Sequence, residues 1–394
     1  MRILQIHNKY LQLGGEDTVV QNERSLLTQN GHEVMLCELD NKDLEGLSKT
    51  TLFARTVFNK HAYKKVVDCI DQFQPDLVHI HNVFYEASPS IFFALKQKNV
   101  PTVMTIHNYR FGCIQGLLFR DNLICRLCID NKSAYYGIKH KCFQNSFAKS
   151  LQLTLVNALH SFALKHRNPV QQYIFLAIFT KELLTPTLAI KANNWSIKPN
   201  YVSDFGHTPF EHREDYYLFV GRLNEQKGVK QLIDIFTANQ KKLIIIGTGP
   251  LEELVRQAAK KEKNIQYEGY SNNETIIHQL KKSKALIVPS LTYEGQPMTI
   301  LEAFSTGTPV LAANTKNLDT LIESGKNGFL FNPLQTEQTC KIIEKFEHSA
   351  TREIYENARK TYETLYSPQS NYNQLISIYQ RAIQQRKARF GLWT

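Results

Sequence analysis

The chain has 394 residues, which suits two ordinary domains with full cores, and its 42% hydrophobic and 21% charged content is typical of globular proteins. Residues 1–7 form too short an apolar run for a signal peptide, and no stretch of about 18 uncharged apolar residues follows. Composition therefore argues against an exported or membrane-spanning protein and predicts a cytoplasmic one, while the net charge of +11 leaves an anionic partner open.

Short β-branched runs alternate with longer helical patterns, a rhythm that predicts a parallel α/β architecture. Buried strands are expected at residues 2–7, 33–38, 77–81, 103–107 and 174–177, and after a break at 216–220, 242–246, 285–288 and 309–312. The boundaries expected from this rhythm give a first domain over 1–198, a second over 199–370 and a last helix over 371–394. The apolar stripe expected on that helix is formed by Leu375, Ile376, Ile378, Tyr379 and Ile383.

The pattern lapses between about residues 110 and 149, which indicates an insertion in the first domain. Four of the seven cysteines, in a C-x(11)-C-x(2)-C-x(13)-C pattern, are Cys113, Cys125, Cys128 and Cys142. The spacing of the middle pair is typical of a zinc knuckle, and four thiolates would close a structural zinc site. The alternative is a set of reduced thiols without metal, since an odd number of cysteines without an export signal argues against disulfides.

Basic residues are concentrated in residues 101–200, which hold 12 Lys and Arg against 3 Asp and Glu, a balance of +9. Within this stretch, residues 139–149 interleave basic and aromatic side chains, and the apolar run 151–164 follows. This pairing suits a helix at an anionic membrane surface, cationic on one side and rich in Phe and Leu on the other. A helix of the protein core and a solvated basic face are the alternatives.

The most informative motif places two glutamates, Glu294 and Glu302, eight residues apart after an apolar run. The order reads strand, loop, helix, and Pro297 suits the first helical position because its missing N–H costs nothing there. The free backbone amides expected at this helix start belong to Met298, Thr299 and Ile300. Such a helix start attracts an anion, and the two carboxylates beside it can accept hydrogen bonds from sugar hydroxyls, as a nucleotide-sugar requires.

Further motifs follow strand ends in the second half, where open α/β sheets bind their ligands. Arg222 can fork onto phosphate oxygens, and Lys227 supplies a second positive charge that suits a diphosphate leaving group. Gly247 and Gly249 would let the backbone approach a nucleotide, or only turn the chain. Ser290, at the end of another strand, would line the same pocket.

These motifs resemble the signature of the large family of retaining glycosyltransferases with a Glu-x(7)-Glu motif, the family 4 type, in the subset with a cysteine-containing insertion. The resemblance spans nearly the whole chain and implies the GT-B fold, in which two Rossmann-like domains have parallel sheets that face each other across a cleft. The first domain would bind the acceptor, the second the nucleotide-sugar, and the last helix would cross back to the first domain. The donor-binding residues that it implies are Gly14, Gly15, Arg222, Lys227, Gly247, Gly249, Ser290, Glu294, Gly295, Gln296, Pro297, Met298, Thr299 and Glu302.

The same resemblance implies a catalytic set, which consists of His107, Glu294, Arg222 and Lys227. His107 closes a strand of the first domain and would lie against the transferred sugar, which Glu294 would also contact. Glu302 would hold the ribose hydroxyls of the nucleotide.

Three other polar residues of the first domain have more than one interpretation. Glu16, beside the glycine pair, would touch either the acceptor or only solvent. His79 and His81 are two apart on a strand and share one face, so they could form a metal pair. Because no third ligand is in view, a structural role is favoured for both, with His81 or Asn82 as an alternative acceptor contact.

The resemblance therefore implies transfer with retention from a UDP- or GDP-sugar to a saccharide or lipid-linked acceptor, in bacterial surface polysaccharide biosynthesis. No Asp-x-Asp is placed to hold a divalent ion, so no metal is expected to take part in transfer. The basic segment would meet the acceptor or the inner membrane surface, and no nucleic acid is expected. The alternatives are a nucleotide-sugar epimerase of the same fold, a basic nucleic-acid-binding protein and an inactive zinc-braced scaffold.

Overall fold

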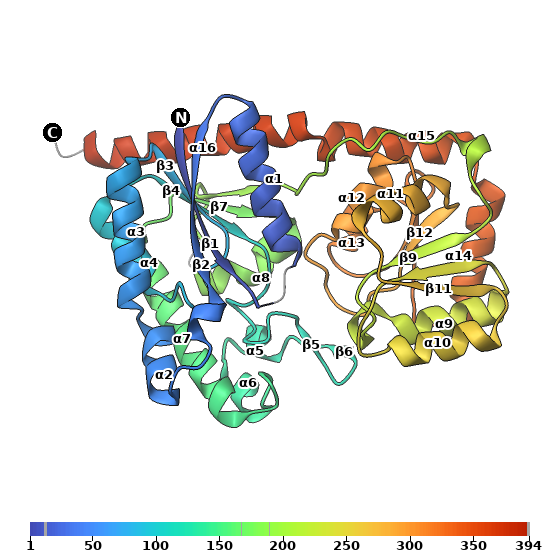
Figure 1. The fold of residues 1–394 in the computed structure, drawn as a ribbon, viewed down its shortest axis with the longest axis horizontal. Coiled ribbons are helices and arrows are strands. Elements are labelled where there is room, and N and C mark those ends of the chain that lie inside the picture. Colours follow the sequence, from blue (N-terminus) through green and yellow to red (C-terminus); the bar gives the residue numbers. More distant parts are fainter. Residues whose placement is uncertain (12–13, 167, 189, 392–394) are drawn as a thin grey trace. The chain divides into compact units, whose positions relative to one another are not determined.

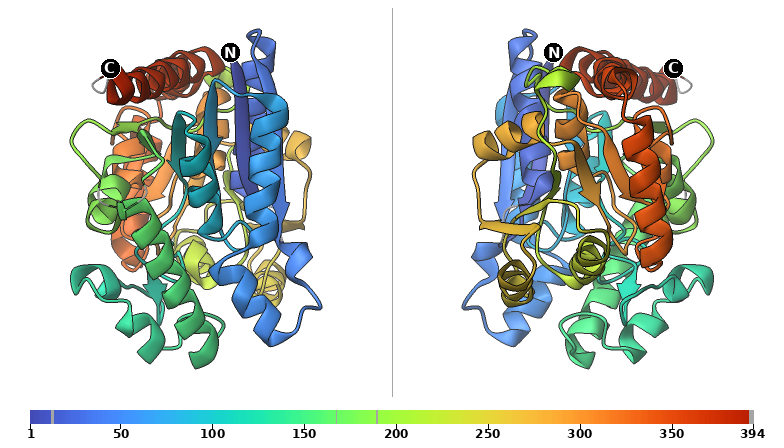
Figure 2. Two further views of the ribbon diagram at one scale, coloured as in Figure 1. Left: turned by 90° about the vertical axis from the view of Figure 1, so that its left-hand side faces the viewer. Right: turned by 90° about the vertical axis from the view of Figure 1, so that its right-hand side faces the viewer.

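The structure, a computed structural model, describes residues 1–11, 14–166, 168–188 and 190–391. The chain forms two compact units (Figure 1). Unit 1 comprises residues 1–118, 126–199 and the chain from Tyr372 on, and unit 2 comprises residues 119–125 and 200–371. Each unit contains one six-stranded parallel sheet with helices on both faces (Figures 1 and 2), which confirms the predicted α/β architecture. Among the described helices, none has a window long and apolar enough to cross a membrane.

The sheet of unit 1 has the strand order β2-β1-β3-β4-β7-β8. Its strands are β1 (Arg2–Lys9), β2 (Glu33–Asp40), β3 (Leu77–Ile80), β4 (Thr102–Ile106), β7 (Gln172–Phe175) and β8 (Trp195–Ile197). The main helices are α1 (Gly15–Gln29), α2 (Lys49–Val57), α3 (Lys60–Phe73), α4 (Ser90–Lys98), α7 (Phe147–His166) and α8 (Ile178–Leu188). Five of the strands were expected from the sequence, whereas β8 has only three residues and lacks a β-branched run.

The sheet of unit 2 has the order β11-β10-β9-β12-β13-β14. Its strands are β9 (Tyr217–Val220), β10 (Leu243–Ile246), β11 (Ile265–Gly269), β12 (Ala285–Val288), β13 (Val310–Ala313) and β14 (Gly328–Phe331). Its helices include α9 (Val229–Asn239), α10 (Glu252–Lys261), α11 (Asn273–Lys282), α12 (Met298–Ser305), α13 (Leu318–Leu321), α14 (Thr336–Ser349) and α15 (Arg352–Thr361). Successive strand residues enter separate cores on the two faces, so the strands are apolar throughout. The edge strands β11 and β14 were not predicted, since polar residues interrupt the apolar run of β11 and β14 has only three apolar residues after its glycine.

The last helix, α16 (Pro368–Gly391), begins in unit 2 and packs on unit 1 from Tyr372 on. Of its predicted apolar stripe, Leu375, Ile378 and Tyr379 are buried in the core of unit 1, and Ile376 and Ile383 pack at its edge. The predicted insertion contains the short helices α5 (Leu127–Asp130) and α6 (Tyr135–Lys139) and a small antiparallel hairpin, β5 (Phe119–Arg120) with β6 (Leu123–Ile124). Contacts group this hairpin with unit 2 and the rest of the insertion with unit 1.

Candidate active site

The loops after β9, β10 and β12 meet at the carboxyl edge of the unit 2 sheet, where backbone hydrogen bonds join them. The amide of Leu223 donates to the carbonyl of Thr248 at 2.9 Å, and the amide of Leu291 donates to the carbonyl of Gln226 at 2.8 Å. Gly228 has φ +67°, and a Cβ there would lie 2.0 Å from the carbonyl oxygen of Pro289, so no other residue fits without a shift of the backbone. This close packing fixes the positions of the residues that follow each strand.

Gly247 and Gly249 are required by contacts within the protein. A Cβ on Gly247 would meet the carbonyl oxygen of Gly221 at 1.9 Å, and one on Gly249 would meet that of Leu223 at 2.4 Å. The sequence suggested two reasons for these glycines, a close approach to a ligand or a turn of the chain. The structure adds a third reason. They let the loop after β10 lie directly on the loop after β9.

Lys227 and Glu294, which lie 67 residues apart in the sequence, meet at this edge. The Nζ of Lys227 lies 2.6 Å from Oε1 of Glu294, and the hydroxyl of Ser290 donates to the same oxygen at 2.6 Å. Asn317 donates its side-chain amide to the backbone carbonyl of Glu294 at 2.7 Å and holds the loop in place. Arg222 is exposed, and the described residues offer its guanidinium no hydrogen bond or ion pair. One cation, Lys227, thus stands beside an oriented carboxylate.

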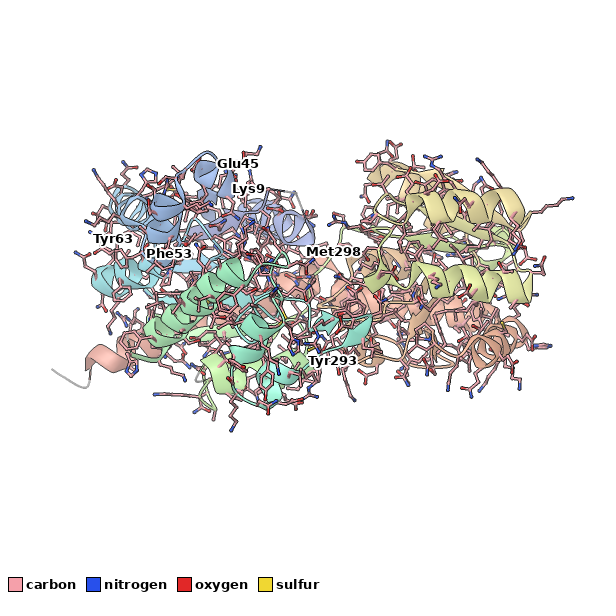
Figure 3. All side chains as sticks on the ribbon, turned by 90° about the horizontal axis from the view of Figure 1, so that it is seen from below. Lys9, Glu45, Phe53, Tyr63, Tyr293 and Met298 are labelled. Carbon is pink, nitrogen blue, oxygen red and sulfur yellow. The ribbon has the colours of Figure 1, made fainter. Side chains whose placement is uncertain are left out.

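Helix α12 starts directly after this loop, close to where the sequence places it. Pro297 is the residue before the first helical position, which Met298 occupies. Three amides were predicted to be free at this helix start, and for Ile300 the prediction is wrong. Its amide donates to the carbonyl of Pro297 at 3.2 Å. Met298 and Thr299 remain in the first turn with amides that the helix does not use. Figure 3 labels Tyr293 and Met298, which lie on either side of the Glu294–Pro297 segment.

Glu302 lies in the second turn of α12 and is partly buried. Burial raises the pKa of its carboxyl to about 7, because a charged carboxylate loses hydration there and no cation compensates for it. Gln296 is buried in the preceding loop, where its Oε1 accepts the backbone N–H of Asn200 at 2.6 Å. Gln296 therefore ties the donor-side loop to the start of the unit 2 chain, a role that its motif alone did not reveal.

A ladder of histidines lies at the carboxyl edge of the unit 1 sheet. His7 lies in β1 and His79 in β3, whereas His81 directly follows β3 and His107 directly follows β4. Their rings contact one another in sequence, so the side chains gather on one face of the sheet. Nδ1 of His81 and Nε2 of His107 lie 3.1 Å apart. Burial lowers the pKa of His107 to about 3, so this imidazole stays neutral at physiological pH and can share one proton with His81.

Glu23 and Lys198 form a fully buried ion pair beneath this ladder, with Lys198 Nζ 2.7 Å from Glu23 Oε1. Burial by itself would raise the pKa of Glu23, but the charge and hydrogen bond of Lys198, together with His81 and His107, outweigh it and hold the pKa below its usual value. The other carboxylate oxygen of Glu23 lies 3.5 Å from Nδ1 of His79 and from Nε2 of His81, which gives the histidine pair a third group. A cation there would face the Lys198 ammonium, so the cluster suits a structural network better than a metal ion.

Sequence reasoning missed this pair, although a signal existed. Glu23 occupies an apolar position in the period of α1, among the buried residues Val19, Val20, Leu26 and Leu27. A carboxylate in the apolar stripe of a helix indicates a buried partner. Nothing in the local sequence marks Lys198 as that partner.

A second polar group surrounds Arg110, just after His107. The guanidinium donates from Nε to the Tyr10 hydroxyl at 3.2 Å and from Nη1 to the Tyr85 hydroxyl at 2.6 Å. Asn108 donates to Oε1 of Glu16 at 2.7 Å. Glu16 thus makes a defined contact within unit 1, and burial raises the pKa of its carboxyl. Gly14 directly precedes the nearby helix α1, and no atom of the described residues lies within 4 Å of a Cβ added there, so these residues do not require a glycine at this position.

Two segments of the chain match known protein families. Residues 13–127 match the family described as Glycosyltransferase Family 4, and residues 203–361 match that described as Glycosyl transferases group 1. These matches identify two glycosyltransferase domains in a chain that has the GT-B fold. It is 24% identical over 172 residues to the O-antigen chain mannosyltransferase C of Escherichia coli, a match that covers 42% of this chain and 46% of that one.

Two solved structures share the fold of this chain over almost its whole length. The lipopolysaccharide outer core galactosyltransferase WaaB, in its apo form, superposes with a TM-score of 0.63 and 19% identity, covering 98% of this chain and all of the other. The Anabaena protein Alr3699/HepE in complex with UDP gives 0.64 and 17%, covering 96% and 99%. By sequence, the matched region spans 44% to 50% of the first three curated relatives.

The cysteines of the insertion are divided between the two units of the chain. Cys125 ends the hairpin grouped with unit 2, whereas Cys113, Cys128 and Cys142 belong to unit 1. The three sulfur atoms in unit 1 do not all lie within 4.8 Å of one another, while thiolates around one zinc ion, each at about 2.3 Å, would lie within about 4 Å. The zinc site stays a prediction.

Proposed function

We propose that this chain is a retaining glycosyltransferase that transfers a sugar from a UDP- or GDP-sugar to a saccharide or lipid-linked acceptor in bacterial surface polysaccharide biosynthesis. The observation that carries the proposal is the Lys227–Glu294–Ser290 contact beside the start of α12, with Glu302 one turn further on. A cation, an oriented carboxylate and a helix start together suit a sugar diphosphate. The UDP complex of the Anabaena structure supports a uridine nucleotide as the first donor to test.

Each side chain at this edge has a distinct role in the proposed reaction. Glu294, held by Ser290, accepts a hydrogen bond from a hydroxyl of the transferred sugar, and Glu302 accepts from the ribose. Lys227 and the exposed guanidinium of Arg222 bind the diphosphate. Their charges stabilise the leaving group most when the bond to the sugar is nearly broken and negative charge has gathered on the phosphate oxygen.

The proposed transfer replaces one bond at the anomeric carbon on the same face of the sugar. The bond from that carbon to the leaving phosphate oxygen breaks, and a bond to the acceptor oxygen forms. The acceptor proton passes to the leaving phosphate oxygen, so the step needs neither a covalent enzyme intermediate nor a metal ion. The neutral imidazole of His107 can donate or accept a hydrogen bond at a sugar hydroxyl without adding charge.

Nucleotide binding provides the first test. A ligand that binds only the folded protein raises its melting temperature, so UDP, GDP, ADP and their sugar conjugates are screened by thermal shift. One nucleotide series should stabilise the wild type and lose its effect on Glu302→Ala. Glu323→Ala, which removes an exposed glutamate of the same unit, is the matched control and should respond as the wild type does. If no nucleotide stabilises the wild type, the proposal is wrong.

The stereochemistry of donor hydrolysis tests retention without knowledge of the acceptor. Proton NMR of the first product should show the anomer of the donor before it equilibrates in water. The opposite anomer would refute same-face transfer, and a changed sugar still attached to its nucleotide would show epimerase activity instead.

A further inference from the structure

Helix α7 has one face in the core of unit 1 and an opposite face that is almost entirely apolar although it is exposed. Its exposed large side chains are Phe147 (56% exposed), Leu151 (38%), Leu155 (43%), Leu159 (36%) and Phe162 (52%). At 100° per residue, these five positions fall within an arc of about 120°, which Ala148 and Ala158 share. Only in the last turn do polar residues, Lys165 and His166, enter this arc. We call this row of side chains the α7 stripe. A continuous apolar stripe of this length on a surface indicates a binding partner.

Helix α2 continues the apolar surface beside α7. The two helices pack against each other, and the side-chain amide of Gln152 on α7 donates to the hydroxyl of Thr56 on α2 at 2.7 Å. Phe53, one turn before Thr56, is 44% exposed. Figure 3 labels Phe53 on α2, with α7 drawn in green next to it. The aromatic ring therefore widens the apolar surface beyond one helix.

The charges around the α7 stripe are positive. Residues 131–181 contain seven Lys and Arg and no Asp or Glu. Lys149 and Lys165 are exposed near the two ends of the stripe, and Lys49 is exposed at the start of α2, which also has no acidic residue. Long lysine side chains can keep their ammonium groups in water while their methylene stems lie along an apolar surface.

We infer that the α7 stripe and Phe53 form a surface that docks on a bilayer containing anionic lipids. The apolar side chains would enter the boundary between headgroups and acyl chains, and the lysines would bind lipid phosphates. The helix lies along this surface and does not cross it, because its other face is part of the core: Leu153, Val156 and Leu164 are buried. Charge complementarity favours this occupant over a second copy of the chain, since two copies of one cationic face repel each other.

This inference rests on the proposed function with its lipid-linked acceptor. Docking on the bilayer would bring that acceptor within reach of unit 1. Membrane binding can be measured without any transfer, so the two can fail separately. A protein that binds nucleotide but not vesicles would overturn only the docking surface. A protein that binds vesicles but no nucleotide would overturn only the proposed reaction.

The test is sedimentation of the full chain with vesicles of phosphatidylcholine, with and without about 30% phosphatidylglycerol. The wild type should bind the anionic vesicles, and salt of about 1 M should weaken the binding. The double variant Leu155→Asp/Phe162→Asp should bind at least about tenfold more weakly and keep the nucleotide-induced thermal shift. Leu334→Asp is the control, since Leu334 is 60% exposed in unit 2, and it should bind as the wild type does.

A second measurement excludes self-association. In analytical ultracentrifugation without lipid, the wild type and the double variant should have the same mass. A wild-type dimer that the double variant loses, without vesicle binding, would assign the α7 stripe to a contact between copies and overturn the inference. Equal vesicle binding by the wild type and the double variant would also overturn it, because the lysines alone would then explain the affinity.

Discussion

His160 gives a sharp prediction about the pH dependence of stability. It lies on the buried face of α7 with no exposed surface, and its ring packs against Phe84, Phe92 and Phe111 at centroid distances of 4.9, 5.7 and 6.0 Å. Among the residues that the structure describes, neither ring nitrogen has a hydrogen-bond partner. Burial lowers the pKa of this imidazole from 6.5 to about 3. The folded protein therefore holds it neutral where an unfolded chain would protonate it.

The size of the effect follows from this difference in pKa. Below pH 6.5 the unfolded chain binds a proton at this histidine that the folded chain does not bind, so the free energy of unfolding falls as the pH falls. The loss is about 1.4 kcal/mol for each pH unit and reaches about 2 kcal/mol at pH 5. It continues until the pH approaches the folded pKa near 3.

The variant His160→Leu removes the titrating group and keeps an apolar side chain in the aromatic cage. Urea unfolding is measured at about pH 7.5 and pH 5 by tryptophan fluorescence in variants that also carry Trp393→Phe, so that Trp195 in β8 reports on unit 1. The difference in unfolding free energy between the two pH values should shrink by about 2 kcal/mol relative to the wild type. His278→Gln, at an exposed position of unit 2, is the control.

Two results would refute this reasoning. If His160→Leu keeps the full pH dependence of the wild type, the folded protein must bind the proton at His160 despite the apolar cage. If His278→Gln reduces the pH dependence as much as His160→Leu does, the effect does not come from burial.

The remaining predictions concern the buried ion pair, a glycine and the cysteines. Lys198→Met should lower the free energy of unfolding by about 3–5 kcal/mol because it leaves the Glu23 charge buried alone, whereas Glu23→Leu/Lys198→Met should recover most of that loss; urea unfolding measures both. Gly228→Ala should destabilise clearly more than Gly325→Ala, since both glycines have positive φ but only a Cβ at Gly228 meets backbone atoms, and equal losses would show that the loop gives way. Protein purified without added metal should contain about one zinc per chain, and less than about a tenth of that would contradict the zinc prediction.

Particular residues show how far sequence reasoning reaches at the candidate site. Glu294, Glu302 and Pro297 could be placed on a loop and a helix start because strand, turn and helix signals are local. The close contact of Lys227 with Glu294 could not be predicted, because 67 residues and three strands separate the two positions. The sequence also could not tell whether a residue near the predicted pocket contacts a ligand or the protein itself. Gly247 is an example, because a Cβ there would meet the carbonyl oxygen of Gly221.

The amino-acid sequence by itself determined the alternation of strands and helices, the carboxyl-end positions of the polar motifs and the cationic, acid-free stretch around α7. These features depend on periodicity and on side-chain chemistry over a few residues. Tertiary structure decided that Glu23 and Lys198 meet, that the histidines share one buried face, and that α7 exposes its apolar stripe. These outcomes depend on which elements lie side by side in the fold. Burial then determines which groups stay charged and which pKa values shift.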